Sequence, residues 1–479
     1  MGSLKKNLGY QTLYQILNTC LPLITSPYLS RVLEAKQLGI FSYTQSIANY
    51  FTLIAMLGVV NYGTRTIASC MNNQKKRSDV FWNIYAFQWI ISFITIIAYV
   101  MYICFFVKEN IGISWIQGLY IVAVLVDISW LFFGVEKFGV IVKINMIIRV
   151  TSVILILVFV KTPKDLWIYG LIMPGGVIVS NLFLWFFASR IIDISYIKNI
   201  KLSKIKVHIK PNLMLFIPLI AMSVYRIMDK TMLGAISTFE QSGYYYNVDK
   251  IINIPVGIIT GVGTVMLPRV TNIIESGKQE KSDELFKISI EILTIVSSAM
   301  AFGIAAISKE FTPFFFGKGF EQCTPLIIVL SPVLIIKGFS HTARMQYLIP
   351  NHKESIFIQS VFIGAIVNFI INIFLIPRFN AMGAVLGTLI AELITCLWQY
   401  IRMSRYINCG FIILKTLIYF LFGIVMFIMV RLIASVVGNG ALGIIIEITT
   451  GATVYGLLCI VFWKVTKNSD LKLVLNKMK

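Results

Sequence analysis

The sequence predicts an all-α protein that crosses a membrane about fourteen times. Hydrophobic residues make up 57% of the 479-residue chain and charged residues only 13%, about half the charged share of a soluble domain. Apolar runs of about 18 residues or more, each long enough to span a bilayer, recur along the whole chain. The polar connections between these runs are short. A polytopic membrane protein without a separate soluble domain is therefore expected.

The predicted spans follow one another with connections of a few to about twenty residues. Their boundaries are 8–30, 40–64, 81–107, 113–133, 139–160, 166–189, 212–233, 243–267, 286–307, 324–349, 355–376, 381–404, 410–434 and 441–463. At about 20 residues per span, they take up most of the chain. Because their number is even, both termini are expected on the same side of the membrane.

The distribution of Lys and Arg indicates which side that is. If both termini are cytoplasmic, the inner segments hold 27 of the 42 basic residues, the outer segments hold 10, and 5 lie within spans. Positive charge collects on cytoplasmic loops of membrane proteins. We therefore expect a multi-pass protein of the inner (plasma) membrane with both termini in the cytoplasm. The same loops explain the net charge of +21, so no nucleic-acid partner is predicted.

Two halves of the chain share a pattern at one constant spacing. The equivalent residues are Gly39 and Gly243, Asn49 and Asn253, and Arg65 and Arg269. This repeat indicates two similar halves, which is common among membrane transporters.

The segment 190–211 lies between the halves and serves as their linker. It is basic but keeps a stripe of isoleucines, so it could lie as an amphipathic helix on the anionic inner leaflet. A solvated cytoplasmic loop is the other interpretation. The same two interpretations apply to the cytoplasmic tail 464–479.

No catalytic or metal-binding pattern is found. The seven cysteines form no C-x-x-C pair and the three histidines do not cluster, so neither a metal site nor a disulfide framework is predicted. Paired carboxylates in an outer loop and a Gly-rich phosphate loop are also missing. The sequence therefore predicts a protein that is not an enzyme and that needs no cofactor.

Basic residues within the apolar spans are the strongest functional signal. Each such charge costs about 2.5–3.5 kcal/mol on insertion and persists where it faces a partner or a water-filled cavity. The five are Arg149, Arg226, Lys250, Lys337 and Arg344. Together they predict a cationic cavity for an anionic substrate, because Arg in particular binds phosphate oxygens in a bidentate manner. Alternatively, each pairs with a carboxylate, and the candidates are Asp127, Asp229, Asp249, Glu291, Glu392 and Glu447.

Polar side chains in the same spans could contact sugar rings. The candidates are Gln45, Asn49, Tyr246 and Asn253, which offer amides and an aromatic face. Each could instead form a hydrogen bond between helices, worth about 0.6 kcal/mol in a membrane protein.

Several of these features also resemble a known family. The N-terminal run contains Pro22 and Pro27, then Ser30-Arg31-Val32-Leu33, Gly39, Asn49 and Tyr62-Gly63-Thr64-Arg65. Together with the stretch 228–245, it is similar to the Wzx-type polysaccharide-biosynthesis flippases, and the similarity covers most of the chain. The resemblance implies the multidrug/oligosaccharidyl-lipid/polysaccharide transporter fold, with two pseudo-symmetric six-helix bundles around a central cavity. The bundles would be 1–189 and 212–405, followed by two extra helices in 410–463.

The activity that the resemblance implies is transport. Undecaprenyl-diphosphate-linked oligosaccharide repeat units would be moved from the inner to the outer leaflet by alternating access, for O-antigen or capsule synthesis. Membrane lipids and the polysaccharide polymerase machinery would be partners. A lipid II flippase and a multidrug/cation antiporter of the same fold are the alternatives. The antiporter would need a cavity centred on carboxylates, whereas basic residues outnumber acidic ones within these spans. A membrane-bound sugar-polymer enzyme is a further alternative, which the short outer connections disfavour.

Overall fold

The computed structural model is all-helical in the residues that it describes. Its backbone is described for residues 2–408, 410–438 and 440–466. Side chains are described for the same residues except 2–20, 217–219, 221, 262, 264–265 and 411–415. Eleven helical segments among the described residues are long and apolar enough to cross a membrane. The expectation of an all-α polytopic membrane protein is therefore confirmed. The predicted spans 8–30, 40–64 and 212–233 lie outside those eleven segments, so the count of fourteen stays a prediction.

The chain forms two compact units, Met1–Gly243 and Tyr244–Lys479. The division lies inside one helix, α11 (Phe239–Glu275), whose first turn belongs to the first unit. The predicted bundles 1–189 and 212–405 divide the chain at a different place and stay a prediction.

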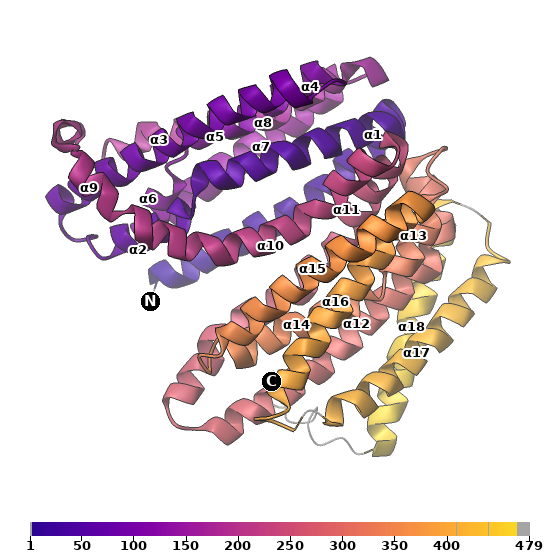
Figure 1. Cartoon of the computed structure of the whole chain (residues 1–479). Coiled ribbons are helices and arrows are strands. Elements are labelled where there is room, and N and C mark those ends of the chain that lie inside the picture. Colours follow the sequence, from indigo (N-terminus) through magenta and orange to yellow (C-terminus); the bar gives the residue numbers. More distant parts are fainter. Residues whose placement is uncertain (1, 409, 439, 467–479) are drawn as a thin grey trace. The chain divides into compact units, whose positions relative to one another are not determined.

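The first unit contains ten further α-helices and two short 3₁₀ helices among its described residues (Figure 1). They are α1 (Gly2–Met56), α2 (Val59–Ala68), α3 (Gln74–Phe106), α4 (Ile111–Gln117), α5 (Leu119–Leu125), α6 (Ser129–Gly134), α7 (Phe138–Phe159), η1 (Pro163–Asp165), α8 (Leu166–Ala188), η2 (Ile194–Asn199), α9 (Leu202–Val207) and α10 (Ile209–Ile236). Helix α1 packs against α3, α7 and α10.

Helix α1 is long enough for two spans, and it is broken at Glu34. The backbone there has φ 62° and ψ 172°, a region that is favourable essentially only for glycine. Pro22 and Pro27 lie inside the helix before the break. The break thus falls between the predicted spans 8–30 and 40–64, within what is otherwise one continuous helix.

Aromatic side chains form the core of the first unit at one end. Phe81 and Trp130 are fully buried and stack with their ring centroids 5.1 Å apart. The Trp130 indole donates a hydrogen bond of 2.9 Å to Gln88 Oε1, and Trp185 donates one of 2.9 Å to the Val126 carbonyl. Since these residues come from α3, α6 and α8, the contacts fix how the helices pack.

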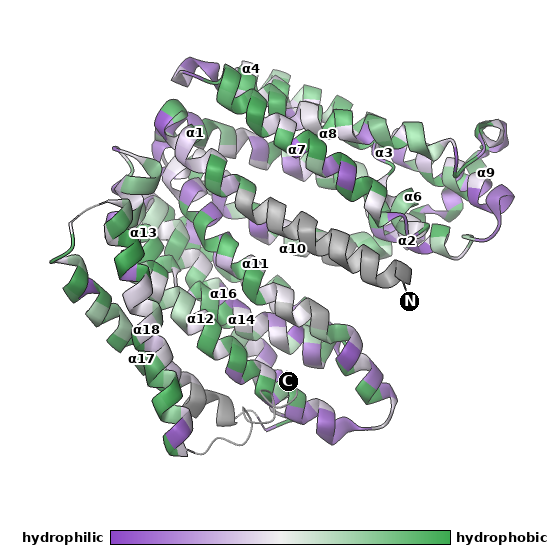
Figure 2. Cartoon of the chain, turned by 180° about the vertical axis from the view of Figure 1, so that it is seen from behind, coloured by the Kyte–Doolittle hydropathy of each residue, from purple (hydrophilic) through white to green (hydrophobic). Residues whose placement is uncertain are grey.

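The predicted linker packs against α3 in the first unit. Lys204 on α9 forms a 2.6 Å ion pair with Asp79, and the Trp82 indole donates 2.9 Å to the Asp193 carbonyl. Of the isoleucine stripe, Ile194 is exposed and Ile205 is buried. Figure 2 shows hydrophilic residues around α9 and hydrophobic ones along α3 and α7.

The second unit continues α11 and adds seven α-helices and one π-helical turn among its described residues. They are α12 (Gln279–Phe316), α13 (Cys323–Leu330), α14 (Val333–Ala343), η3 (Arg344–Leu348), α15 (Glu354–Phe379), α16 (Ala381–Met403), α17 (Gly410–Ala434) and α18 (Ala441–Thr466). The last two lie side by side along α12 (Figure 1).

Buried polar contacts hold this last pair of helices against α12. The Tyr419 hydroxyl donates a 3.0 Å hydrogen bond to Glu291 Oε1, and the Trp463 indole donates one of 3.1 Å to the same hydroxyl. Arg431 forms a 2.6 Å ion pair with Glu310. The helices predicted in 410–463 are therefore an integral part of the second unit.

Helices α15 and α16 form a tight antiparallel pair joined by one residue, Asn380. A Cβ on Gly383 would lie 2.4 Å from the Leu375 carbonyl oxygen, and one on Gly387 would lie 2.1 Å from Asn372 Oδ1. Glycine at these two positions lets the helix backbones approach closely.

Candidate functional site

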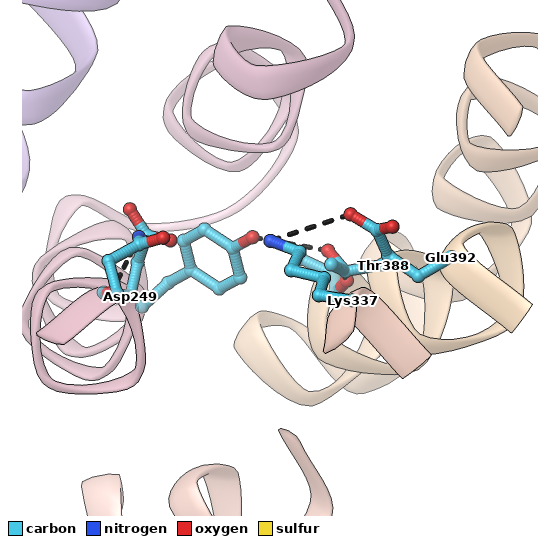
Figure 3. Close-up of polar contacts among 7 residues, drawn as sticks. Asp249, Lys337, Thr388 and Glu392 are labelled. Atoms are coloured by element: carbon cyan, nitrogen blue, oxygen red, sulfur yellow. Dashed lines mark hydrogen bonds and ion pairs between the residues drawn. The ribbon is translucent and has the colours of Figure 1, made fainter. Parts of the chain in front are cut away.

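A polar cluster in the second unit contains one of the predicted basic residues (Figure 3). Lys337 on α14 lies with its Nζ 3.4 Å from Glu392 Oε1 on α16. The side chains are 28% and 10% exposed, so this is a half-buried ion pair. For Lys337, the structure agrees with the alternative that a span lysine pairs with a carboxylate.

Residues of α11 lie on the other side of this cluster. The Tyr245 hydroxyl is 3.2 Å from Thr388 Oγ1 on α16, and Figure 3 shows Thr388 beside Lys337 and Glu392. Asn253 donates a 2.7 Å hydrogen bond to Asp249 Oδ1. The Asn253 amide, predicted to contact substrate, thus holds a carboxylate of its own helix.

Lys250 and Tyr246, both predicted site residues, contact each other. The Lys250 Nζ lies 3.9 Å from the centre of the Tyr246 ring, which is cation–π distance. Tyr246 is buried at 6% exposure, and Lys250 is partly exposed. One predicted cation therefore rests on an aromatic face at the start of the second unit.

Arg344 opens the π-helical turn η3. Its Nη2 lies 3.0 Å from His341 Nδ1, and since guanidinium only donates, Nδ1 accepts this bond. The Arg344 Cζ also lies 4.8 Å from the centre of the Phe357 ring. Turns of this kind often occur at functional sites. Here the turn lets Arg344 contact both α14 and α15.

In the first unit, Gln45 and Arg149 both interact with Tyr120. Gln45 Nε2 donates 3.1 Å to the Tyr120 hydroxyl, and Arg149 lies close enough to interact with it electrostatically. Arg149 is exposed on α7. Asn49 is partly exposed one turn along α1 from Gln45. Tyr120 was not predicted, although a tyrosine inside an apolar run was a usable signal.

Arg226 lies on α10, which hydrogen bonds hold against α1. Thr231 Oγ1 donates to Ser46 Oγ at 2.9 Å and lies 3.3 Å from the Tyr50 hydroxyl. Asp229 is buried at 5% exposure and interacts electrostatically with Tyr50. Arg226 itself is exposed. No ion pair of its guanidinium occurs within the described part of the chain.

The predicted residues thus form local groups within each unit. Tyr246 contacts Lys250, and Gln45 and Arg149 share Tyr120. Lys337 and Arg344 have separate partners although they lie on one helical segment. Sequence reasoning missed Tyr245 and Thr388, because the partner of a hydroxyl depends on packing between distant helices. A single cavity formed by all nine predicted residues stays a prediction.

An apolar groove lies between α14, α16 and α17 in the second unit. It has a volume of about 1090 Å³. Its walls include Ile335, Phe339, Leu397, Tyr400, Leu417 and Phe420, and one end carries Ser404, Arg405 and Asn408. An elongated apolar molecule with a polar group at one end matches this lining.

Two solved structures of membrane transporters resemble this chain in fold. The structure resembles a lipid II flippase MurJ in an inward closed conformation, with a TM-score of 0.75 and 14% identity. The similarity covers 95% of this chain and 99% of that structure. Over 81% of this chain and 98% of the other, it resembles an inward-facing multidrug resistance transporter of the MATE family, with a TM-score of 0.57 and 11% identity. The protein therefore has the fold shared by MurJ and the MATE transporters.

The family model of polysaccharide biosynthesis proteins matches residues 4–274. The chain belongs to this family. It is 23% identical to a protein of Escherichia coli strain K12 named "Putative O-antigen transporter", over 85% of this chain and 99% of that protein. It is also 24% identical to the lipid II flippase MurJ of Bacillus subtilis strain 168, over 43% of this chain and 41% of that protein.

Proposed function

We propose that this protein is a flippase that moves undecaprenyl-diphosphate-linked oligosaccharide units from the inner to the outer leaflet of the plasma membrane. The family membership and the name of the Escherichia coli relative support this role. The units would serve cell-surface polysaccharide synthesis, and the polymerase machinery would act on them after transport.

The apolar groove of about 1090 Å³ is the observation that carries the proposal. A substrate on an isoprenoid carrier needs an apolar surface for its chain. The polar end of the groove, with Arg405 and Asn408, suits the head of such a lipid. A soluble sugar or a small ion would leave this apolar surface uncovered.

The diphosphate would be bound by exposed cations. Arg226 and Arg149 are exposed on their helices in the first unit, and a guanidinium offers paired donors to phosphate oxygens. Transport would follow alternating access between two helical bundles, 1–189 and 212–405.

A lipid II flippase is the second candidate. The structural similarity to MurJ, with a TM-score of 0.75, favours it over an antiporter. The two candidate substrates would share the isoprenoid diphosphate and differ in the head group that it carries. Complementation distinguishes the two candidates. The oligosaccharide flippase is supported if the protein rescues a strain that lacks its O-antigen or capsule flippase but does not rescue a strain that lacks MurJ.

Substitutions in the groove test the proposal. Leu417 and Leu421 are both exposed and lie one turn apart on α17, but only Leu417 lines the groove. Leu417→Trp should narrow the groove and lower export of lipid-linked sugar at normal protein levels. Leu421→Trp is the matched control and should export normally. Equal export by both variants would show that the groove does not hold the lipid chain.

A further inference from the structure

A smaller pocket lies in the first unit, and its lining includes none of the nine predicted site residues. It has a volume of about 250 Å³ and is formed by α1, α3, α4, α10 and the start of α11. Its walls include Tyr43, Tyr99, Tyr102, Phe106, Phe239 and Ala235, and its rim includes Lys108, Glu109 and Asn110. The lining therefore combines aromatic faces with hydrogen-bonding groups.

Three aromatic side chains of α3 form one wall of the pocket. Tyr99 and Tyr102 stack with centroids 6.2 Å apart, and Tyr102 stacks on Phe106 at 6.0 Å. The Tyr99 hydroxyl donates 2.7 Å to the Ser114 carbonyl, which fixes α3 against α4. Three neighbouring rings on successive turns of α3 thus present one continuous surface.

The opposite wall holds Tyr43 in place. A Cβ on Gly234 would lie 2.2 Å from the Tyr43 ring, so α10 packs directly on this side chain. Tyr43 lies near Phe239, with ring centroids 5.9 Å apart, and its side chain also interacts with Tyr102. The pocket is therefore built by packing among five helices.

The rim carries groups of both signs. Lys108 and Glu109 are exposed in the connection between α3 and α4, and Asn110 begins α4 with a left-handed φ of 55°. A carboxylate accepts hydrogen bonds, an ammonium donates them, and an amide does both. A neutral ligand with several hydroxyl groups can satisfy all three.

We propose that this pocket binds one pyranose ring of the transported oligosaccharide. The proposal rests on the proposed function and adds a sugar subsite to it. The C–H face of a pyranose is apolar and would stack on the tyrosines, while its hydroxyls would bond to Glu109, Asn110 and Lys108. An isoprenoid chain has no group that could form hydrogen bonds with these three side chains.

Filling the pocket tests this assignment. Ala235 and Ile236 are adjacent and exposed near the end of α10, but only Ala235 lines the pocket. Ala235→Trp should occupy the space without removing a polar group, and Ile236→Trp is the matched control. The full-length protein in lipid nanodiscs would be probed with methyl glycosides of hexoses, N-acetylhexosamines and hexuronic acids. Saturation transfer from protein to the sugar ring protons is the readout.

The expected result is saturation transfer to at least one glycoside with the wild type and Ile236→Trp, and its loss with Ala235→Trp. Glu109→Gln, which weakens a hydrogen bond, and Tyr102→Ala, which removes a stacking ring, should each weaken binding about tenfold. Transfer that is absent with all proteins, or equal in both Trp variants, would overturn the sugar subsite.

Export measurements separate this proposal from the proposed function. If the wild type rescues a flippase-null strain and Ala235→Trp rescues it equally, the sugar subsite is wrong and the flippase function stands. If glycosides bind as expected but the wild type exports no lipid-linked sugar, the pocket stands and the substrate class is wrong.

Discussion

Gly39 and Gly243 lie against each other where α1 meets the first turn of α11. A Cβ on Gly39 would lie 2.9 Å from the Gly243 nitrogen and 1.6 Å from the Phe239 carbonyl oxygen. A Cβ on Gly243 would lie 1.9 Å from the Ala35 carbonyl oxygen. The two glycines, which occupy equivalent positions in the sequence repeat, thus form one backbone-to-backbone contact.

This contact should not tolerate a methyl group. Gly39→Ala should destabilise the protein by about 3 kcal/mol, the upper range for overpacking, because the obstacle is backbone. Gly175→Ala is the control, since a Cβ there meets nothing within 4 Å. Thermal unfolding in detergent is the measurement, and equal midpoints for the two variants would show that α1 and α11 are further apart.

The Lys337–Glu392 pair predicts a pattern of loss and rescue. Glu392→Leu leaves a half-buried ammonium unpaired and should cost about 3–5 kcal/mol. Lys337→Met combined with Glu392→Leu should regain most of that stability. The control is Asp79→Asn in the more exposed Lys204–Asp79 pair, with an expected cost of up to about 1 kcal/mol. If the double variant folds but loses export, Lys337 also binds substrate.

Export should depend on the positive charge of Arg226. Arg226→Ala should lower export about tenfold or more, the loss expected for charge-assisted hydrogen bonds, while protein levels stay normal. Arg226→Lys should keep part of the activity, because a point charge remains. Arg378→Ala, at an exposed position near the end of α15, is the control. Normal export by Arg226→Ala would remove this residue from the proposed site.

His208 should make stability depend on pH. It lies before α10, with its Nδ1 2.8 Å from the Tyr62 hydroxyl. Burial lowers the pKa of His208 below its usual 6.5, and the Asp79 charge partly opposes this. Neutral His208 therefore contributes its full stabilisation to the folded state above pH 6.5, and this contribution is lost as the pH falls below that value. The melting temperature should drop between pH 7 and pH 5, and it should drop less for His208→Gln.

Labelling of single cysteines should establish the topology. In a cysteine-free protein, Ser203→Cys on α9 should be shielded from a membrane-impermeant reagent added outside the cell. Thr238→Cys, just after α10, should react. Both positions are exposed in the structure, so burial cannot explain a difference. The opposite pattern would place the termini outside.

The helical fold was predictable because a bilayer imposes long apolar runs, which composition alone reveals. The sequence predicted a break between residues 30 and 40, but not its position at Glu34, since no glycine or proline marks that residue. Among the site residues, Lys337 and Glu392 were each visible as unusual charges within apolar sequence. Their pairing depends on how α14 packs against α16, and the sequence pattern holds no information on that contact.

The single-residue connection at Asn380 has a consequence for how the protein is made. The end of α15 and the start of α16 must stay close together, because only one residue connects them. Gly383 and Gly387 also let the two backbones approach along the first turns of α16. During synthesis, the second helix emerges from the ribosome while the first is still at the membrane insertion machinery. We expect the two helices to enter the bilayer together as a hairpin. Each would then satisfy polar groups of the other before α17 and α18 have been synthesised.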